Sequence, residues 1–213
     1  TLSAGYYGTD TTLGIDSPSV TEGDLGFADL VFTVTLSNPS SQQVAVCYKT
    51  APGTADRITD YTSVWYTLVF EPGETVRTLT VRVVGDTIDE DDAESFTVTL
   101  SDPWNAELDP AYTVATGTII DDDEPPVLVV YDTVPALEPT EEGEPLRFLL
   151  ELSNPSKHSL SFDYRTSQAV AADGSLPETS AQAGVDYDDT HEDAFGTVTF
   201  SPGETRRYVT LTT

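Results

Sequence analysis

The sequence predicts an all-β protein made of two tandem, immunoglobulin-like antiparallel β-sandwiches, the second incomplete within the 213 residues. Apolar and polar residues alternate in short runs rich in β-branched side chains, such as 30–36, 78–83 and 96–100. This period of two is typical of half-buried strands. Clusters of Gly, Pro, Asn and Asp separate the runs, and no long stretch has helical periodicity.

An internal repeat predicts the domain organisation. Leu-Ser-Asn-Pro-Ser occurs at 36–40 and again at 152–156, and Phe-x-Pro-Gly-Glu-Thr occurs at 70–75 and again at 200–205. Two copies of one unit indicate tandem domains. We expect an N-terminal extension over 1–12, a first domain over 13–123, a linker over 124–126 and a partial second domain over 127–213.

The first copy contains seven expected strands. They cover residues 13–17, 30–36, 44–50, 67–70, 77–84, 95–100 and 112–120. The Pro-Gly pairs of the repeat predict type II turns, in which glycine takes the third position.

The second copy begins its first strand at Val127 and reaches residue 213 inside its fifth strand. Its last two strands are expected either from following residues of the same chain or from a neighbouring subunit by strand complementation. The 1–12 extension is a candidate donor for such pairing.

Composition excludes several classes of function. The net charge of −28, from 37 acidic and 9 basic residues, argues against binding to nucleic acid or anionic lipid. No apolar run is long enough to insert in a membrane. The lone Cys47 gives neither a disulfide nor a zinc site. With two histidines, no nucleophile–histidine–carboxylate set and no phosphate-binding glycine loop, we do not expect an enzyme.

The acidic residues are predicted to gather at one end of the first domain. Successive loops of an up-and-down traverse alternate between the two ends, so alternate loops share an end. The acids at this end are Glu22, Asp60, Asp86, Asp89, Glu90, Asp91, Asp92, Glu94, Asp121, Asp122 and Asp123. Crowded carboxylates repel one another, and a divalent cation relieves that repulsion. Oxygen ligands without histidine or cysteine favour Ca²⁺. A solvated acidic surface without bound ions is the alternative.

Several motifs together resemble the Calx-β domain family, which includes modules of the sodium/calcium exchanger regulatory loop and of bacterial surface proteins. They are Val-Thr-Glu-Gly at 20–23, Gly-Thr-Ala at 53–55 with Asp60-Tyr61, the Pro-Gly turn at 70–75, the acidic loop and strand at 86–101, and Gly-Thr-Ile-Ile-Asp-Asp-Asp at 117–123. The resemblance covers nearly all of the first copy and the first two-thirds of the second.

The resemblance implies a calcium-ligand set. In the first copy it comprises Glu22, Asp60, Asp86, Asp91, Glu94, Asp121, Asp122 and Asp123. In the second copy, Glu142 and Asp186 match the first two ligand positions.

The expected function is a calcium-binding, calcium-stiffened structural or adhesive module of a larger protein, located outside the cell or on its surface. The alternatives are a calcium-sensing module of a membrane transporter, an accessory module of a secreted enzyme, and a salt-adapted spacer without calcium. Trp65 and Trp104 are interpreted as core or cross-strand residues, with a carbohydrate-binding face as the alternative.

Overall fold

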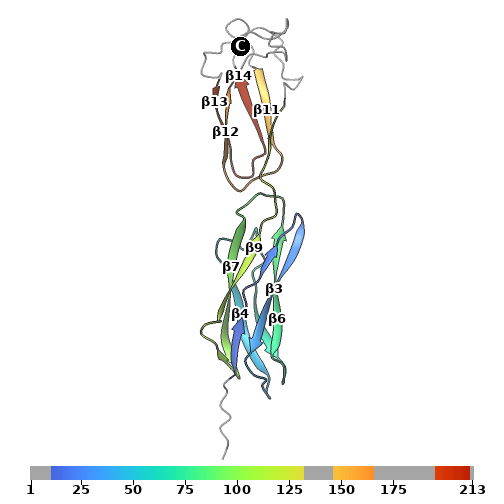
Figure 1. Ribbon diagram of the computed structural model, residues 1–213, viewed down its shortest axis with the longest axis vertical. Helices are drawn as coiled ribbons and strands as arrows, with labels where there is room; N and C mark the ends of the chain where they lie inside the picture. Colours follow the sequence, from blue (N-terminus) through green and yellow to red (C-terminus); the bar gives the residue numbers. More distant parts are fainter. Residues whose placement is uncertain (1–10, 132–145, 166–194, 212–213) are drawn as a thin grey trace, which may run out of the picture. The chain divides into compact units, whose positions relative to one another are not determined.

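The computed structural model describes residues 11–131, 146–165 and 195–211. Within these ranges all regular secondary structure consists of β-strands (Figure 1). The chain divides into two compact units. The first unit comprises Thr1–Thr87 and Asp91–Asp123, and the second comprises Ile88–Glu90 and Glu124–Thr213. Among the described residues, no helix is long and apolar enough to cross a membrane.

The first unit is a sandwich of two sheets. One sheet has the strand order β2-β9-β7-β4-β5 and the other has the order β6-β3-β1-β8. The strands are β1 (Thr12–Ile15), β2 (Ser19–Thr21), β3 (Gly26–Leu36), β4 (Val44–Pro52), β5 (Trp65–Phe70), β6 (Val76–Gly85), β7 (Ala93–Trp104), β8 (Glu107–Leu108) and β9 (Val114–Ile120). The predicted all-β sandwich class is therefore confirmed.

The first predicted strand differs from expectation because it is split between the sheets. β1 pairs antiparallel with β3, whereas β2 pairs parallel with β9. Pro18 lies between the two pieces and has no N–H group to donate to a ladder, so the chain can leave one sheet there and join the other. The short strand β8, which the sequence did not predict, also pairs parallel with β1. The sheets are thus not wholly antiparallel.

The core of the first unit lies between its two sheets. Alternate residues of β3 and β7 are buried, and the ring of Phe32 meets the ring of Phe96 edge-on at 6.1 Å between centroids. Tyr61 stacks on the other side of Phe96 at 4.2 Å. Gly117 of β9 lies against both phenylalanines, in a space that would admit a Cβ atom only if the rings moved.

The second unit contains five strands among its described residues. They are β10 (Leu128–Tyr131), β11 (Leu146–Leu152), β12 (Leu160–Arg165), β13 (Phe195–Phe200) and β14 (Arg206–Leu211). They form the sheets β10-β11-β14 and β12-β13. A small core contains Leu150, Leu152, Val198, Phe200 and Val209.

The repeated Pro-Gly turns have the same geometry in both units. Gly73 and Gly203 have φ angles of 89° and 75°, which favour glycine. Glu74 and Glu204 donate their backbone N–H groups to Glu71 and Ser201, at 2.9 Å in each case. The predicted type II turns are therefore confirmed.

One edge of β12 has no paired strand among the described residues. In the first unit β4 lies between β5 and β7, whereas β12 pairs with β13 alone. The strand that would complete this edge stays a prediction. Residues 1–10 of the candidate donor lie outside the described residues, and Thr12 already belongs to β1.

Replacing Gly117 with alanine is expected to lower the free energy of unfolding by about 1–3 kcal/mol. A Cβ atom there would lie 2.7 Å from Phe96 and 2.8 Å from Phe32, so two buried rings would have to move. Chemical denaturation measures the change. Thr116→Ala, on the exposed side of the same strand, is the control. Equal stabilities for the parent and Gly117→Ala would contradict this packing.

Candidate metal centre

Three buried carboxylates mark one end of the first unit. Glu22, Asp60 and Glu94 are only 5%, 5% and 3% exposed. Burying a charge is costly unless a partner compensates it. All three belong to the ligand set that the sequence resemblance implies, so the structure gives these acids an environment unlike that of an ordinary solvated surface.

The first group of carboxylates forms where β2 and β9 end. Glu22, Asp121 and Asp123 each offer an oxygen, and these atoms lie within 4.8 Å of one another. β2 and β9 are parallel, so both strands leave the sheet in the same direction. Glu22 donates its backbone N–H to Ile120 at 3.2 Å, which continues the pairing beyond the strands.

Backbone hydrogen bonds shape the segment that follows β9. Asp122 Oδ1 accepts a hydrogen bond from the Gly23 N–H at 3.0 Å. Asp121 Oδ1 accepts one from the Asp123 N–H at 3.2 Å. The Asp122 side chain therefore links the segment after β9 to the end of β2, and the Asp121 side chain stabilises a turn within the acidic segment.

Gly85 allows this turn to lie close to the end of β6. A Cβ atom at Gly85 would overlap the carbonyl oxygen of Gly23 and lie 2.7 Å from that of Glu22. Asp86 follows directly, so the close approach also brings the start of the β6–β7 loop to the group.

The second group consists of Asp60 and Glu94, whose carboxylate oxygens also lie within 4.8 Å of each other. Glu94 has the same strand parity as the buried residues Phe96 and Val98, so its carboxylate points into the sandwich. Asp60 Oδ2 accepts a hydrogen bond from the Asp56 N–H at 2.6 Å. This bond fixes the orientation of the Asp60 carboxylate.

Asp123 provides the strongest electrostatic indication of a cation. Its Oδ2 atom is buried and has no hydrogen-bond partner. Burial raises the pKa of Asp123, and repulsion from Asp121, Asp24, Asp122 and Asp86 raises it further. A bound cation would remove both penalties, because it supplies a partner and cancels the like charge.

The structure brings together most of the sequence-predicted acids. Asp86 and Asp122 lie near enough to Asp123 to affect its pKa. Asp91 is exposed and belongs to neither carboxylate group. Glu142 and Asp186 lie outside the described residues.

Sequence reasoning did not select Asp24 as a ligand, although Asp24 raises the pKa of Asp123. Strand parity assigns a loop to one end of the domain, but it does not say which residues of that loop come close to the site.

The chemistry of both groups fits Ca²⁺. They contain carboxylate oxygens and no histidine or cysteine. Ca²⁺ takes six to eight oxygen ligands in flexible geometry, whereas zinc in proteins prefers nitrogen and sulfur. The residues that would hold ions are Glu22, Asp121 and Asp123 in one group, and Asp60 and Glu94 in the other.

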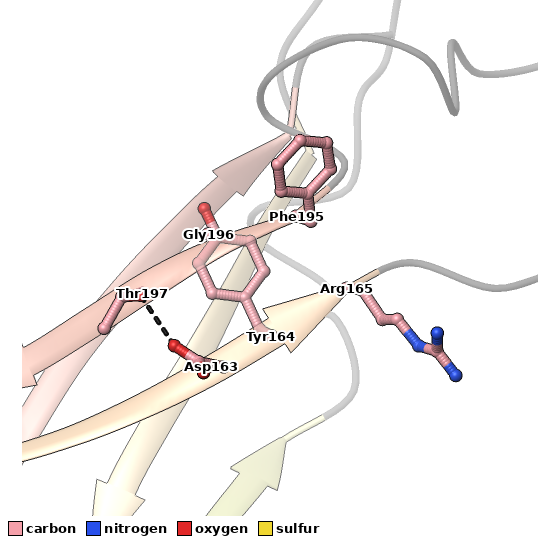
Figure 2. Close-up of a pocket in the computed structure, with 6 residues that line it drawn as sticks. All are labelled: Asp163, Tyr164, Arg165, Phe195, Gly196 and Thr197. Atoms are coloured by element: carbon pink, nitrogen blue, oxygen red, sulfur yellow. Dashed lines mark hydrogen bonds between the residues drawn. The ribbon is translucent and has the colours of Figure 1, made fainter.

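The second unit contains a hollow lined by residues of β12 and β13. Figure 2 shows Asp163, Tyr164, Arg165, Phe195, Gly196 and Thr197 around it, at the ends of β12 and β13. Asp163 accepts a hydrogen bond from the Thr197 hydroxyl at 2.6 Å, and the arginine side chain points away. The residues drawn include neither a histidine nor a cysteine.

The sequence model of the Calx-beta domain matches residues 10–123 and 167–213. The chain belongs to the Calx-beta domain family. This family consists of calcium-binding modules, and both carboxylate groups described above lie within the first matched range.

Solved structures of Calx domains are among those similar to this chain. The apo-form Calx CBD1 domain is 25% identical, with a TM-score of 0.47, over 53% of this chain and 98% of that one. The calcium binding domain CBD12 of CALX1.1 is 20% identical, with a TM-score of 0.48, over 93% and 74% of the respective chains. Among curated proteins, no sequence matches.

Without calcium, Asp123→Asn is expected to stabilise the protein at neutral pH. The pKa of Asp123 lies above its ordinary value of 3.8 in the folded state, so the folded state binds this proton more tightly than the unfolded state. The free energy of unfolding therefore falls as pH rises from 3.8 through the folded-state pKa. In the Asp123→Asn variant, the free energy of unfolding should decrease less over this pH range.

Denaturation in chelator across acid and neutral pH measures this effect. Asp109→Asn, near the opposite end of the first unit, is the matched control and should follow the parent curve. If Asp123→Asn showed the same pH dependence as the parent, burial and neighbouring acids would not raise the pKa of Asp123.

Proposed function

We propose that this chain is a calcium-binding structural module of a larger protein outside the cell or on its surface. The observation that carries the proposal is the pair of carboxylate groups at one end of the first unit. Five acids that converge in two groups, three of them buried, match the ligands that Ca²⁺ requires.

Calcium would act on the connection between the two units. Asp121 and Asp123 belong to the first carboxylate group, and the linker Glu124-Pro125-Pro126 follows directly. An ion held by these acids fixes the end of the first unit, and the two prolines restrict the residues that follow. The proposed result is a spacer that bends less when calcium is bound.

A regulatory module of a transporter would use the same carboxylates as a sensor. The two roles differ in the affinity they need, because extracellular modules bind calcium at about 10⁻⁴–10⁻³ M and sensors at about 10⁻⁷–10⁻⁵ M. The strongly acidic composition and the proline-containing linker favour the spacer.

Calcium is expected to raise the melting temperature of the chain by several degrees. Binding to the folded state alone adds about 2.7 kcal/mol at a concentration 100 times Kd. Melting in calcium and in chelator measures the shift. Glu94→Gln, which alters a buried ligand, should lose most of it, whereas Asp109→Asn should keep it. Equal responses in the two variants would mean that the ions bind elsewhere.

Calcium is also expected to reduce bending at the linker. Small-angle X-ray scattering of the chain should give a larger maximum dimension with calcium than with chelator. The double variant Asp121→Asn, Asp123→Asn should show no such difference. An unchanged profile for the parent, despite a calcium-dependent melting shift, would rule out stiffening and leave calcium binding intact.

A further inference from the structure

Both tryptophans of the chain are exposed strand residues, so of the two expected placements, core or cross-strand, the core placement is wrong. Trp65 is 79% exposed and Trp104 is 57% exposed. Tryptophan is among the most buried side chains on average, since exposing its ring leaves a large apolar area in water. Two tryptophans exposed in one small domain require an explanation.

The two rings lie on the same outer face of the five-stranded sheet. Trp65 pairs with Lys49 of β4, and Trp104 pairs with Ala45 of the same strand. Val44 and Val46 are buried, so Ala45 and Lys49 point outward, and paired residues share a face. The tryptophans are four residues apart along the strand direction, which is about 13 Å. Across the strands they are two strand spacings apart, which is about 10 Å.

A β-bulge turns Trp104 outward. The register passes from Cys47↔Ser101 to Ala45↔Trp104, so three residues of β7 span two of β4. Without the extra residue, Trp104 would share the inward parity of Leu100. Bulges reverse the face to which later side chains point, and they are common beside functional sites.

Two residues at and beside the bulge have positive φ angles. Asp102 and Asn105 have φ angles of 50° and 59°, and they are the non-glycine residues with positive φ among the described residues. They lie on either side of Trp104. Asn105 also donates its side-chain N–H to the Gln43 carbonyl at 2.9 Å, which fixes the segment. Such conformations persist where the surrounding structure enforces them, often at binding sites.

Hydroxyl groups occupy the face between the two rings. The paired rows place Thr67 and Ser101 beside Cys47, and Thr99 beside Lys49. Cys47 Sγ lies 3.6 Å from Thr67 Oγ1. Lys49 is the one charged residue in these three paired rows, in a chain of net charge −28.

We propose that this face binds a neutral oligosaccharide whose sugar rings carry equatorial hydroxyl groups, as in β-linked glucose or N-acetylglucosamine chains. Such rings present flat C–H faces that stack on indole, while their edges offer hydroxyls to threonine, serine and lysine. The net charge disfavours polyanions, and Lys49 disfavours a cationic ligand over the indoles. This proposal does not depend on calcium binding.

Tryptophan fluorescence tests the proposal directly, because the chain contains no other tryptophan. Titration of the full chain with cellohexaose and with chitohexaose should shift the emission to shorter wavelength in a saturable way. Calorimetry should then show about tenfold weaker binding, or none, for Trp65→Ala and for Trp104→Ala. Phe27→Ala, which removes an aromatic ring that is 60% exposed on the other sheet, should bind like the parent.

Three results would overturn the proposal. The first is binding of neither glycan by the folded parent, and the second is undiminished binding by both tryptophan variants. The third is concentration-dependent dimerisation in sedimentation that both variants abolish while no glycan binds. That last result would assign the face to a second copy of the chain.

Discussion

The parallel pairing of β2 with β9 is the constraint on which the metal centre depends. Because both strands leave the sheet in one direction, Glu22 reaches the acids that follow β9. This convergence buries carboxylates and raises the pKa of Asp123 through burial and like charge. The protein without calcium therefore carries an electrostatic cost at this end, which a divalent cation would convert into stabilisation.

Alternation and repetition predicted most of the fold, and with it the location of the candidate site. Six of the seven predicted runs of the first unit correspond to single strands, namely β3, β4, β5, β6, β7 and β9, since each run has one buried face to satisfy. The alternation of successive loops between the two ends of the sandwich was enough to predict that Glu22, Asp60 and Glu94 lie at one end. Glu94 illustrates why, because it keeps the parity of the core residues Phe96 and Val98.

Features that depend on long-range pairing were not predictable in this way. The split at Pro18 places β1 and β2 in different sheets, and only the partner strands determine that choice. The outward turn of Trp104 depends on one extra residue in β7, which the alternation pattern does not reveal. Asp24 approaches Asp123 through loop conformation, and strand parity does not specify that conformation.

The central claim is that calcium binds where these carboxylates converge. An X-ray structure of the protein crystallised with calcium tests it most directly, with anomalous scattering used to locate the ions. We expect ions at about 2.3–2.6 Å from oxygens of Glu22, Asp121 and Asp123, and from oxygens of Asp60 and Glu94. Ions bound only at the opposite end of the first unit, or no ions at a calcium concentration that saturates any shift in melting temperature, would contradict the account.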